Sequence, residues 1–555
     1  MKKILCTIAG IFLLSASLFA QDSGDPEALV SKDVQAYVKT SDISRFLKTI
    51  NYALNTFTDQ QTRTEMLAGR DDFMNKTGID LLSEASLRQN GIDTSRAISV
   101  AVMPQDNYRD VILVFIPVLN EKEFPLKFNE ISKKMGSETS NFKTPLKTKY
   151  KGVTIYQVET ELFTAGFNGF FLMGSNAEVV QKAIDLGKEN ADSLMLDSSY
   201  KDYLASVKNN YDINIFFSKN FLETMKMQKT NPYGMNNSTG MIPVQYGETD
   251  GYYGGESDEY DGDDQADTYT DQGADQASYI DAIDYMSLAI GLDGKKLKMN
   301  SMVRVVKGHA QVERLIGFLK TGIMKNSLKM SKADTTILFG FDLSKLDGFC
   351  KDGNPECADY NNFKMQIMQA TGIDIEKDFI PYFPGVINIM FLDSGAANGV
   401  GDAVLYIPMT NAKKTGVVWE KLRKTMQQQY GPQKMYGEEK LDGKKAFWFT
   451  DGTQMKYYVA YDARGLYVGN SSAFIKTAFK SATMDRGGKV SNMISEKTFM
   501  FINIKKNMML QQAMIMYSGN PALGNFLSMI GEITLHGEKT DTGVSMDFEM
   551  ELKGN

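Results

Sequence analysis

One short motif occurs twice in this chain and constrains its fold more than any other feature. Residues 169–182 read GFFLMGSNAEVVQK, and residues 465–479 read GLYVGNSSAFIKTAF. In each copy a strand-like apolar run reaches a glycine, Gly174 or Gly469, and then changes to a helical pattern. The repeat therefore predicts the same strand, tight turn and helix at two places in the chain.

Polar residues after each glycine predict how the two helices begin. Ser175 followed by Glu178 has the spacing of a capping box, and Ser471 is placed to cap the second helix. Helix starts also attract phosphate and carboxylate groups, but Glu178 in the first turn would repel an anion. We therefore interpret Gly174, Ser175, Glu178, Gly469 and Ser471 as structural turn and cap residues.

Other landmarks of the first half recur in the same order in the second half. The separation between matching residues stays between 289 and 300, which is nearly constant. The matching stretches are 42–45 with 342–345, 77–80 with 371–374, 116–117 with 407–408, 174 with 469, and 213–215 with 502–504. Five matches in one order indicate two copies of one long unit rather than a solenoid of short repeats.

The fold class predicted from this pattern is α+β. We expect two tandem duplicated units, each an antiparallel-dominated sheet with helices on one face. We place the first unit in residues 21–310, a linking helix in 311–331 and the second unit in 332–555. Strict alternation of apolar and polar residues over 544–552 is typical of a half-buried antiparallel strand that closes the second unit.

Local signals mark several ends and turns within the units. Gly78 and Gly372 each follow a threonine and suit a left-handed helix C-cap. Pro117 cannot donate to a sheet ladder, so it should mark a strand end or edge. The Asp-Gly pairs at 442–443 and 451–452 are hairpin-turn signals.

The amino terminus has the parts of a secretory signal peptide. Lys2 and Lys3 precede an apolar stretch that ends at Ala20. We expect cleavage after residues 1–20 and a periplasmic or secreted mature protein that begins near Gln21. No later run approaches the roughly 20 apolar residues that a membrane span needs, so we expect no membrane span after cleavage.

The cysteine content fits an exported protein. Once Cys6 is removed with the signal peptide, only Cys350 and Cys357 remain. In an oxidising compartment such a pair most simply forms a disulfide. A metal site is the less favoured interpretation, because no second Cys or His pair completes a tetrahedral set.

One acidic, Gly- and Tyr-rich segment, residues 230–278, interrupts the first unit. From residue 230 to 294 there are 14 acidic residues and no lysine or arginine. Solvated disorder is the simplest interpretation. Weak calcium binding or docking to a basic surface are the alternatives. The candidate calcium ligands are Glu256, Asp258, Glu259, Asp261, Asp263 and Asp264, and apart from calcium no cofactor is expected.

The residues that carry common catalytic chemistry are sparse. The chain has two histidines, His309 and His536, both beside glycine, and we expect both at the surface. Ser198 and Lys201 have the spacing of a Ser-x-x-Lys dyad, which we interpret as a chance match. No nucleophile-elbow, Walker-type or HExxH motif occurs, so no catalytic residue is assigned.

Methionine is abundant, with 33 residues in the chain. Met508, Met509, Met514 and Met516 lie on one predicted helix. Thioethers can bind Cu(I) in an exported protein, but core filling is the favoured interpretation. An adaptable apolar groove for a lipid or peptide is a further alternative.

The pattern resembles an uncharacterised exported bacterial family, the domain of unknown function 3352. The residues that carry the likeness are 150–153, the Gly174 turn, and Ser193 with Asp197 and Tyr200 after it. The second unit keeps the Gly469 turn but lacks a clear Ser-Leu-x-x-Asp match. The resemblance covers most of the mature chain as two units, implies an envelope location and supplies no catalytic residues.

These observations predict an exported, non-catalytic binding or scaffolding protein of the cell envelope. An envelope protein, a lipid or a peptide are its expected partners, and nucleic acid is not, because no basic footprint is present. Two alternatives remain open. One is an envelope enzyme with a site between the two units, and the other is a calcium-dependent surface adhesin that uses the acidic segment.

Overall fold

A computed structural model describes most of the chain between residues 24 and 553. The described ranges are 24–58, 60–104, 111–135, 145–189, 192–207, 211–230, 280–322, 335–350, 357–392, 401–433, 435–450, 455–480, 494–505 and 529–553. The predicted signal peptide, most of the acidic segment 230–278, the second part of the predicted linker and the Met-rich helix lie outside these residues.

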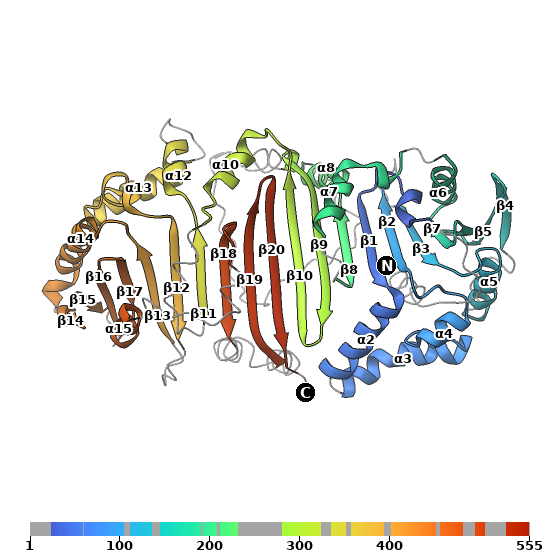
Figure 1. The fold of residues 1–555 in the computed structure, drawn as a ribbon, viewed down its shortest axis with the longest axis horizontal. Helices are drawn as coiled ribbons and strands as arrows, with labels where there is room; N and C mark the ends of the chain where they lie inside the picture. The colour runs from blue at the N-terminus through green and yellow to red at the C-terminus, as the bar shows by residue number, and fades with distance from the viewer. Residues whose placement is uncertain are drawn as a thin grey trace, which may run out of the picture. The chain divides into compact units, whose positions relative to one another are not determined.

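Helices and strands both occur in groups along the first half of the chain (Figure 1). They are η1 (Pro26–Leu29), β1 (Ala36–Asp42), α2 (Ile43–Phe57), α3 (Gln60–Thr77), α4 (Glu84–Gln89), β2 (Ala97–Met103), β3 (Val111–Pro117), α5 (Phe124–Met135), β4 (Leu146–Tyr150), β5 (Val153–Glu159), β6 (Leu162–Phe167), β7 (Phe170–Gly174), α6 (Ala177–Glu189), η2 (Leu194–Leu196), α7 (Ser198–Ser206), β8 (Ile213–Phe217), α8 (Lys219–Thr230), β9 (Ile283–Asp293) and β10 (Lys296–Val305).

The described part of the second half contains a similar but not identical series of elements. They are α10 (Ala310–Phe318), β11 (Thr335–Gly340), α12 (Leu343–Cys350), α13 (Ala358–Thr371), η6 (Ile375–Phe379), η7 (Ile380–Tyr382), β12 (Val386–Leu392), β13 (Asp402–Pro408), α14 (Ala412–Tyr430), η8 (Gly431–Gln433), β14 (Tyr436–Leu441), β15 (Lys444–Thr450), β16 (Lys456–Asp462), β17 (Gly465–Gly469), α15 (Ser472–Lys480), β18 (Thr498–Lys505), β19 (Ile530–Thr540) and β20 (Gly543–Leu552).

The chain forms two compact units. Unit 1 comprises Met1–Leu47, Glu65–Ala205 and Phe216–Tyr285, and unit 2 comprises Lys48–Thr64, Ser206–Ile215 and Met286–Asn555. This division differs from the sequence-based boundary near residue 310. The reason is that β10 pairs along its length with β20, from Lys296 opposite Glu551 to Arg304 opposite Gly543, so β10 forms part of unit 2.

Each unit contains an antiparallel sheet, and the strands pair in the same order in both. In unit 1 the order is β1, β2, β3, β7, β6, β5 and β4. In unit 2 it is β11, β12, β13, β17, β16, β15 and β14, which can be followed in Figure 1. The predicted α+β class with antiparallel sheets is confirmed, whereas the duplication that would explain the shared order stays a prediction.

The repeated motif has the same register in both sheets. Gly174 lies opposite Leu113 on β3, and Gly469 lies opposite Val404 on β13. Pro117 is the last residue of β3, at the strand end that its missing N–H predicts. The landmarks that match along the sequence therefore also occupy matching places in the two sheets.

Helices cover both faces of the sheet in unit 2, although the sequence predicted one. Phe447, Val459 and Leu466 form one buried cluster with Trp419 of α14. Their neighbours Ala446, Ala460 and Tyr467 form another with Phe474 and Ile475 of α15. Successive strand residues point to opposite faces, so the two clusters lie on opposite sides of the strands. The second helical layer follows from apolar residues at both alternating sets of positions.

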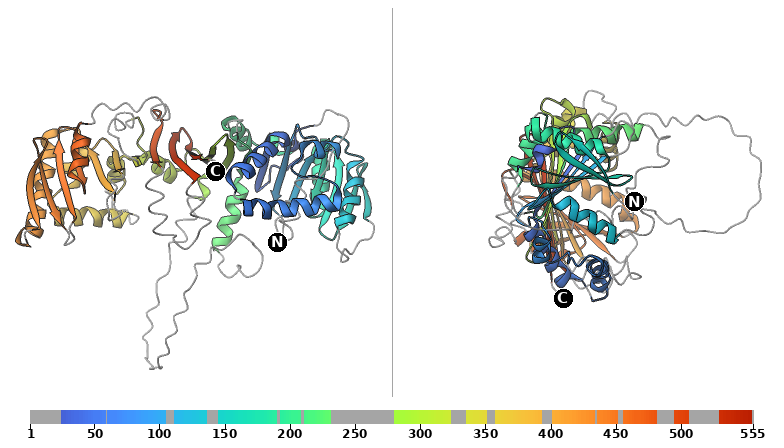
Figure 2. Two further views of the ribbon diagram at one scale, coloured as in Figure 1. Left: turned by 90° about the horizontal axis from the view of Figure 1, so that it is seen from below. Right: turned by 90° about the vertical axis from the view of Figure 1, so that its right-hand side faces the viewer.

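Unit 1 is likewise buried on both faces of β3 and β7. Val114, Ile116 and Phe171 pack with α5 through Phe124 and Phe128. The alternating residues Leu113, Phe115 and Leu172 are fully buried, and α6 packs against β3 and β7. Figure 2 shows α3 and α4 along one end of these strands. Phe73 of α3 and Leu87 of α4 join the cluster.

Local turn predictions hold where the structure describes them. Gly372 ends α13 with a φ of 66°, and Gly78 has a φ of 77° after α3, so both adopt the left-handed conformation. Asp442 and Gly443 form the two-residue turn between β14 and β15 with φ values of 46° and 79°. The pair at 451–452 lies outside the described residues.

The strand β20 is antiparallel as predicted, but its two faces do not differ in burial. Every residue from 544 to 551 is partly exposed. Charged and polar pairs cross to β10, with Lys296 Nζ 2.5 Å from Glu549 Oε1 and the Asn300 amide donating to Asp547 at 2.8 Å. Side chains of β10 therefore cover part of the polar face of β20. This explains why the alternating polar and apolar residues of β20 have similar burial.

Candidate functional site

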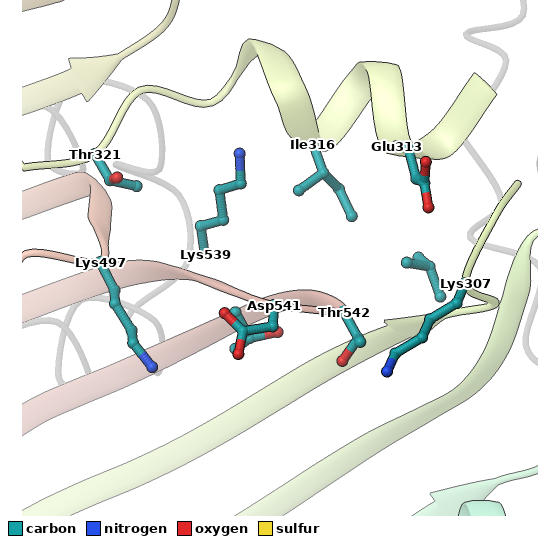
Figure 3. A pocket seen from close by; sticks show the side chains of 10 residues that line it. Lys307, Glu313, Ile316, Thr321, Lys497, Lys539, Asp541 and Thr542 are labelled. Carbon is teal, nitrogen blue, oxygen red and sulfur yellow. The ribbon is translucent and has the colours of Figure 1, made fainter. Parts of the chain in front are cut away.

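A cavity of about 390 Å³ in unit 2 is the candidate functional site (Figure 3). We name it the lysine cavity. Its lining residues are Val305, Lys307, Glu313, Ile316, Thr321, Lys497, Lys539, Thr540, Asp541 and Thr542. They come from the end of β10, from α10 and the segment after it, from the residue before β18, and from the β19–β20 turn. The volume is in the range of small-molecule sites.

Backbone hydrogen bonds bring these segments together. The Val305 N–H at the end of β10 donates to the carbonyl of Thr542 at 2.9 Å. The Lys539 N–H on β19 donates to the carbonyl of Lys497 at 2.9 Å. The β10–β20 and β18–β19 ladders continue these contacts. Backbone hydrogen bonds between strand ends, rather than contacts between the lining side chains, therefore hold these segments together.

The charges that line the cavity are mostly cationic. In the described residues, Lys307, Lys497 and Lys539 have no ion-pair partner. Glu313 is engaged, because its Oε1 accepts a hydrogen bond from the Gly308 N–H at 2.8 Å. Figure 3 shows Asp541 between Lys497 and Lys307, while Lys539 extends toward the side of Thr321 and α10.

Lys539 lies in an unfavourable environment for its own charge. Burial lowers the pKa of its ammonium group, and the positive charge of Lys345 lowers that pKa further. An anion bound nearby would relieve both effects. The hydroxyl oxygens of Thr540 and Thr542 are buried without a hydrogen-bond partner in the described part of the chain, and Thr542 is 6% exposed.

This arrangement offers cations and hydroxyls, which is the chemistry of an anion site. No lining residue is a histidine or cysteine, and the carboxylate of Glu313 is used by the backbone. Covalent catalysis requires a nucleophile hydrogen-bonded to a general base, and in the described residues neither the Thr540 nor the Thr542 hydroxyl has a hydrogen-bond partner. The cavity wall therefore presents cationic and hydroxyl groups.

The predicted cap residues differ in detail from the structure. Asn176, not Ser175, caps α6, since its Oδ1 accepts from the Val179 N–H at 2.9 Å. The Ser175 hydroxyl instead accepts from the Ile112 N–H of β3 at 3.2 Å. Glu178 lies in the first turn of α6 and makes no capping box with Ser175, because that serine is held by the neighbouring strand.

The second copy uses the same positions with the residue types exchanged. Asn470 is bonded to β13 through the Ala403 N–H at 2.6 Å, and Ser471 Oγ accepts from the Phe474 N–H at 3.3 Å. The first residue after the glycine thus joins the neighbouring strand, and the second caps the helix. Position, rather than residue type, decides these roles.

Close packing explains the two glycines of the motif. A Cβ atom on Gly174 would lie 2.5 Å from Val179 Cγ1 and 2.7 Å from Val180 Cγ2. A Cβ atom on Gly469 would overlap the carbonyl oxygen of Ala403 and lie 3.0 Å from Val404 Cγ2. Neither glycine can bind a ligand in a loop, because α6 and β13 already occupy that space.

The other sequence-nominated residues lie apart from the lysine cavity. Cys350 and Cys357 lie at disulfide distance, with Cα atoms 5.4 Å apart. The six candidate calcium ligands between Glu256 and Asp264 lie outside the described residues. Among the residues that are described, no group of three or more His, Cys, Asp or Glu side chains could hold a metal ion.

His309 is partly exposed, whereas His536 is buried, which corrects the surface expectation for that histidine. Its side chain is 6% exposed, and its Nε2 lies 2.7 Å from the Thr498 hydroxyl. Thr498 is fully buried. The neighbouring Gly537 indicated a turn at the surface, but β19 lies between β18 and β20, which buries His536.

Lys201 belongs to the Ser-x-x-Lys match. Its ammonium group donates to the Leu196 carbonyl at 3.4 Å.

No motif in the sequence points to the lysine cavity. Lys307, Lys497 and Lys539 are separated by 190 and 42 residues and share no motif. Only the pairing of β10 with β20 and of β18 with β19 brings them to one place.

Comparison with protein families gives one match. A family described as a protein of unknown function (DUF3352) matches residues 95–240, about a quarter of the chain. This stretch contains the residues 150–153, Gly174 and Ser193 that carry the predicted likeness. The resemblance is confirmed for this stretch, and its extension to the second unit stays a prediction. No curated protein matches the chain significantly.

Solved structures give distant similarities. Crystal forms I, IV and III of TP0453 share 9%, 10% and 10% sequence identity with this chain. The matches cover 53%, 53% and 54% of this chain and 86%, 85% and 88% of TP0453. Each has a TM-score of 0.25, so the similarity carries no argument about function. Within its described part, the chain has no helix with the length and apolar character needed to cross a membrane.

Proposed function

We propose that this chain is an exported, non-catalytic binding or scaffolding protein of the cell envelope, and that its ligand site is the lysine cavity. The observation that supports this proposal is the composition of the cavity wall. Three lysines without ion-pair partners in the described residues line one cavity, and no hydrogen bond pairs a nucleophile with a base there. Such a wall favours capture of an anion over chemical change of it.

Two further observations support export. Residues 1–20 have the charged start, the apolar stretch and the small final residue of a secretory signal. Cys350 and Cys357 are close enough to form a disulfide, which would persist in an oxidising compartment. The match to a family of unknown function over residues 95–240 is compatible with this proposal and adds no activity.

Export is tested by mass spectrometry of the mature protein from its native host. We expect the protein in the periplasm or the medium, with an amino terminus near Gln21 and no free thiol at Cys350 or Cys357. A full-length chain that begins at Met1 in the cytoplasm, with both thiols free, would contradict export.

Ligand capture is tested by native mass spectrometry of protein purified from the envelope. We expect a co-purifying anionic molecule that is lost in the double variant Lys497→Met/Lys539→Met. Lys424→Met is the matched control, because Lys424 is an exposed lysine of α14 outside the cavity. A bound molecule retained equally by all three proteins would place the ligand elsewhere. A hydrolase activity that one polar substitution abolishes would contradict the non-catalytic proposal.

A further inference from the structure

We infer that the lysine cavity selects a phosphate-type oxyanion that carries a small organic group, such as a phosphomonoester or the phosphate of a lipid headgroup. This inference rests on the proposed function, because it names the ligand class of the same site. It follows from four features of the cavity wall: the kind of cation, the placement of the cations, the threonine hydroxyls without partners and the apolar surface beside them.

The cations suit a tetrahedral anion better than a planar one. All three basic residues in the wall are lysines, and no arginine lines the cavity in the described residues. Arginine presents a flat fork that matches a carboxylate, whereas lysine acts as a point charge with three rotatable donors. Lys307, Lys497 and Lys539 come from three different segments, and Figure 3 shows Lys539 extending toward α10 while Lys497 and Lys307 lie on either side of Asp541. Their flexible side chains would have to turn inward to contact one anion together.

The hydroxyl groups add neutral donors at the same wall. Thr540 and Thr542 follow Lys539 at the β19–β20 turn, and their hydroxyl oxygens have no hydrogen-bond partner in the described residues. A buried hydroxyl without a partner is unfavourable. A small rotation of either threonine side chain would let it donate to an anion oxygen that the lysines also contact.

The cavity also has an apolar side. Val305 and Ile316 contribute to the wall, and the volume of about 390 Å³ exceeds what a bare phosphate ion occupies. A hydrophobic wall next to clustered cations favours a ligand with an anionic end and a less polar remainder. Inorganic phosphate should therefore bind more weakly than a phosphomonoester.

Asp541 is a negative charge in the cavity wall, so its removal tests whether the site binds an anion. It lines the cavity between Lys497 and Lys307, and no ion pair joins it to either lysine. Its carboxylate repels an anion at this place. The variant Asp541→Asn should therefore bind a phosphate-type ligand roughly two- to fivefold more tightly than the natural protein.

Isothermal titration calorimetry on the full mature protein tests the inference, with inorganic phosphate, glycerol 3-phosphate and citrate as probes. We expect saturable binding of glycerol 3-phosphate, weaker binding of inorganic phosphate, and the weakest binding of citrate. Lys539→Met should weaken phosphate binding about tenfold or more, because one charge-assisted contact is lost. Lys424→Met should leave it unchanged, and circular dichroism checks that each variant is folded.

Two vesicle compositions separate the possible sources of the phosphate. Binding to phosphatidylglycerol vesicles that Lys539→Met removes, with no binding to phosphatidylcholine vesicles, would identify a lipid headgroup. Binding of soluble phosphomonoesters alone would identify a free ester. Citrate binding without phosphate binding, or equal binding by Lys539→Met and Lys424→Met, would overturn the inference. In that case a co-purifying anion that still depends on Lys497 and Lys539 would leave the proposed function intact.

Discussion

Replacing the motif glycine of unit 2 by alanine tests how the repeated turn is built. In Gly469→Ala the new Cβ would overlap the Ala403 carbonyl oxygen and lie 3.0 Å from Val404 Cγ2. The first of these atoms is backbone in the paired strand β13, so it cannot move without disturbing the ladder. Overpacking of this kind costs about 1–3 kcal/mol, and the backbone contact places this variant near the upper end.

The tryptophans supply an assay for unit 2 alone. The chain has two, Trp419 and Trp448, and both belong to unit 2. In urea unfolding followed by tryptophan fluorescence, a loss of about 3 kcal/mol should lower the midpoint by roughly 1 M for a slope of about 3 kcal/mol per molar urea. Far-ultraviolet circular dichroism follows both units together.

Two glycine variants serve as matched controls. A Cβ on Gly348 of α12 meets no atom within 4 Å. Gly348→Ala should therefore raise the free energy of unfolding of unit 2 by up to about 1 kcal/mol, and the fluorescence midpoint should rise slightly. Gly174→Ala in unit 1 should shift the circular dichroism transition and leave the fluorescence transition in place. A fluorescence midpoint for Gly469→Ala equal to that of the natural protein would refute the packing argument.

Three further predictions concern single side chains. Asn176→Ala removes the α6 cap and should cost about 1 kcal/mol in urea unfolding followed by circular dichroism. Trp419→Phe loses the indole hydrogen bond to the Val459 carbonyl at 3.0 Å and leaves a void, so it should cost about 2 kcal/mol by the same measurement. Burial raises the pKa of Asp462, but hydrogen bonds led by that from Arg464 hold it below its ordinary 3.8. Because a lowered pKa stabilises the fold above the unfolded value, unit 2 should lose stability as the pH falls from about 4 through the folded pKa, which acid titration of tryptophan fluorescence measures.

Each of these predictions has a contradicting outcome. Equal stability of Asn176→Ala and the natural protein would show that another group caps α6. A Trp419→Phe variant with an unchanged midpoint would mean that the buried indole contributes no net energy. For the carboxylate, Asp462→Asn should flatten the acid profile of unit 2, and an unchanged profile would assign the acid sensitivity to other groups.

Short-range features of the fold could be predicted from the sequence. Gly372, Asp442 and Gly443 adopt positive φ values. Glycine tolerates this conformation because it has no Cβ, and a preference of this kind can be read from the residue itself. Pro117 ends β3 because it has no N–H to donate. Each landmark specifies its own turn or strand end through such local preferences. The matching order of landmarks therefore predicted matching elements in the two halves.

Side-chain roles that depend on a neighbouring strand could not be predicted. Ser175 and Asn176 are both good cap residues, and the proximity of β3 to Ser175 leaves Asn176 to cap the helix. His536 is buried because β19 lies between β18 and β20, which its flanking glycine does not reveal. The second helical layer of the unit 2 sheet is different, because apolar residues at both alternating sets of strand positions already indicate burial of both faces.

The sequence by itself therefore determined where strands, turns and helix ends lie, because these depend on the backbone preferences of a few adjacent residues. Only the tertiary structure decided the candidate site. Lys307, Lys497 and Lys539 meet because β10 pairs with β20 and β18 with β19, and pairing between such distant strands is set by the burial of the whole sheet rather than by any local pattern.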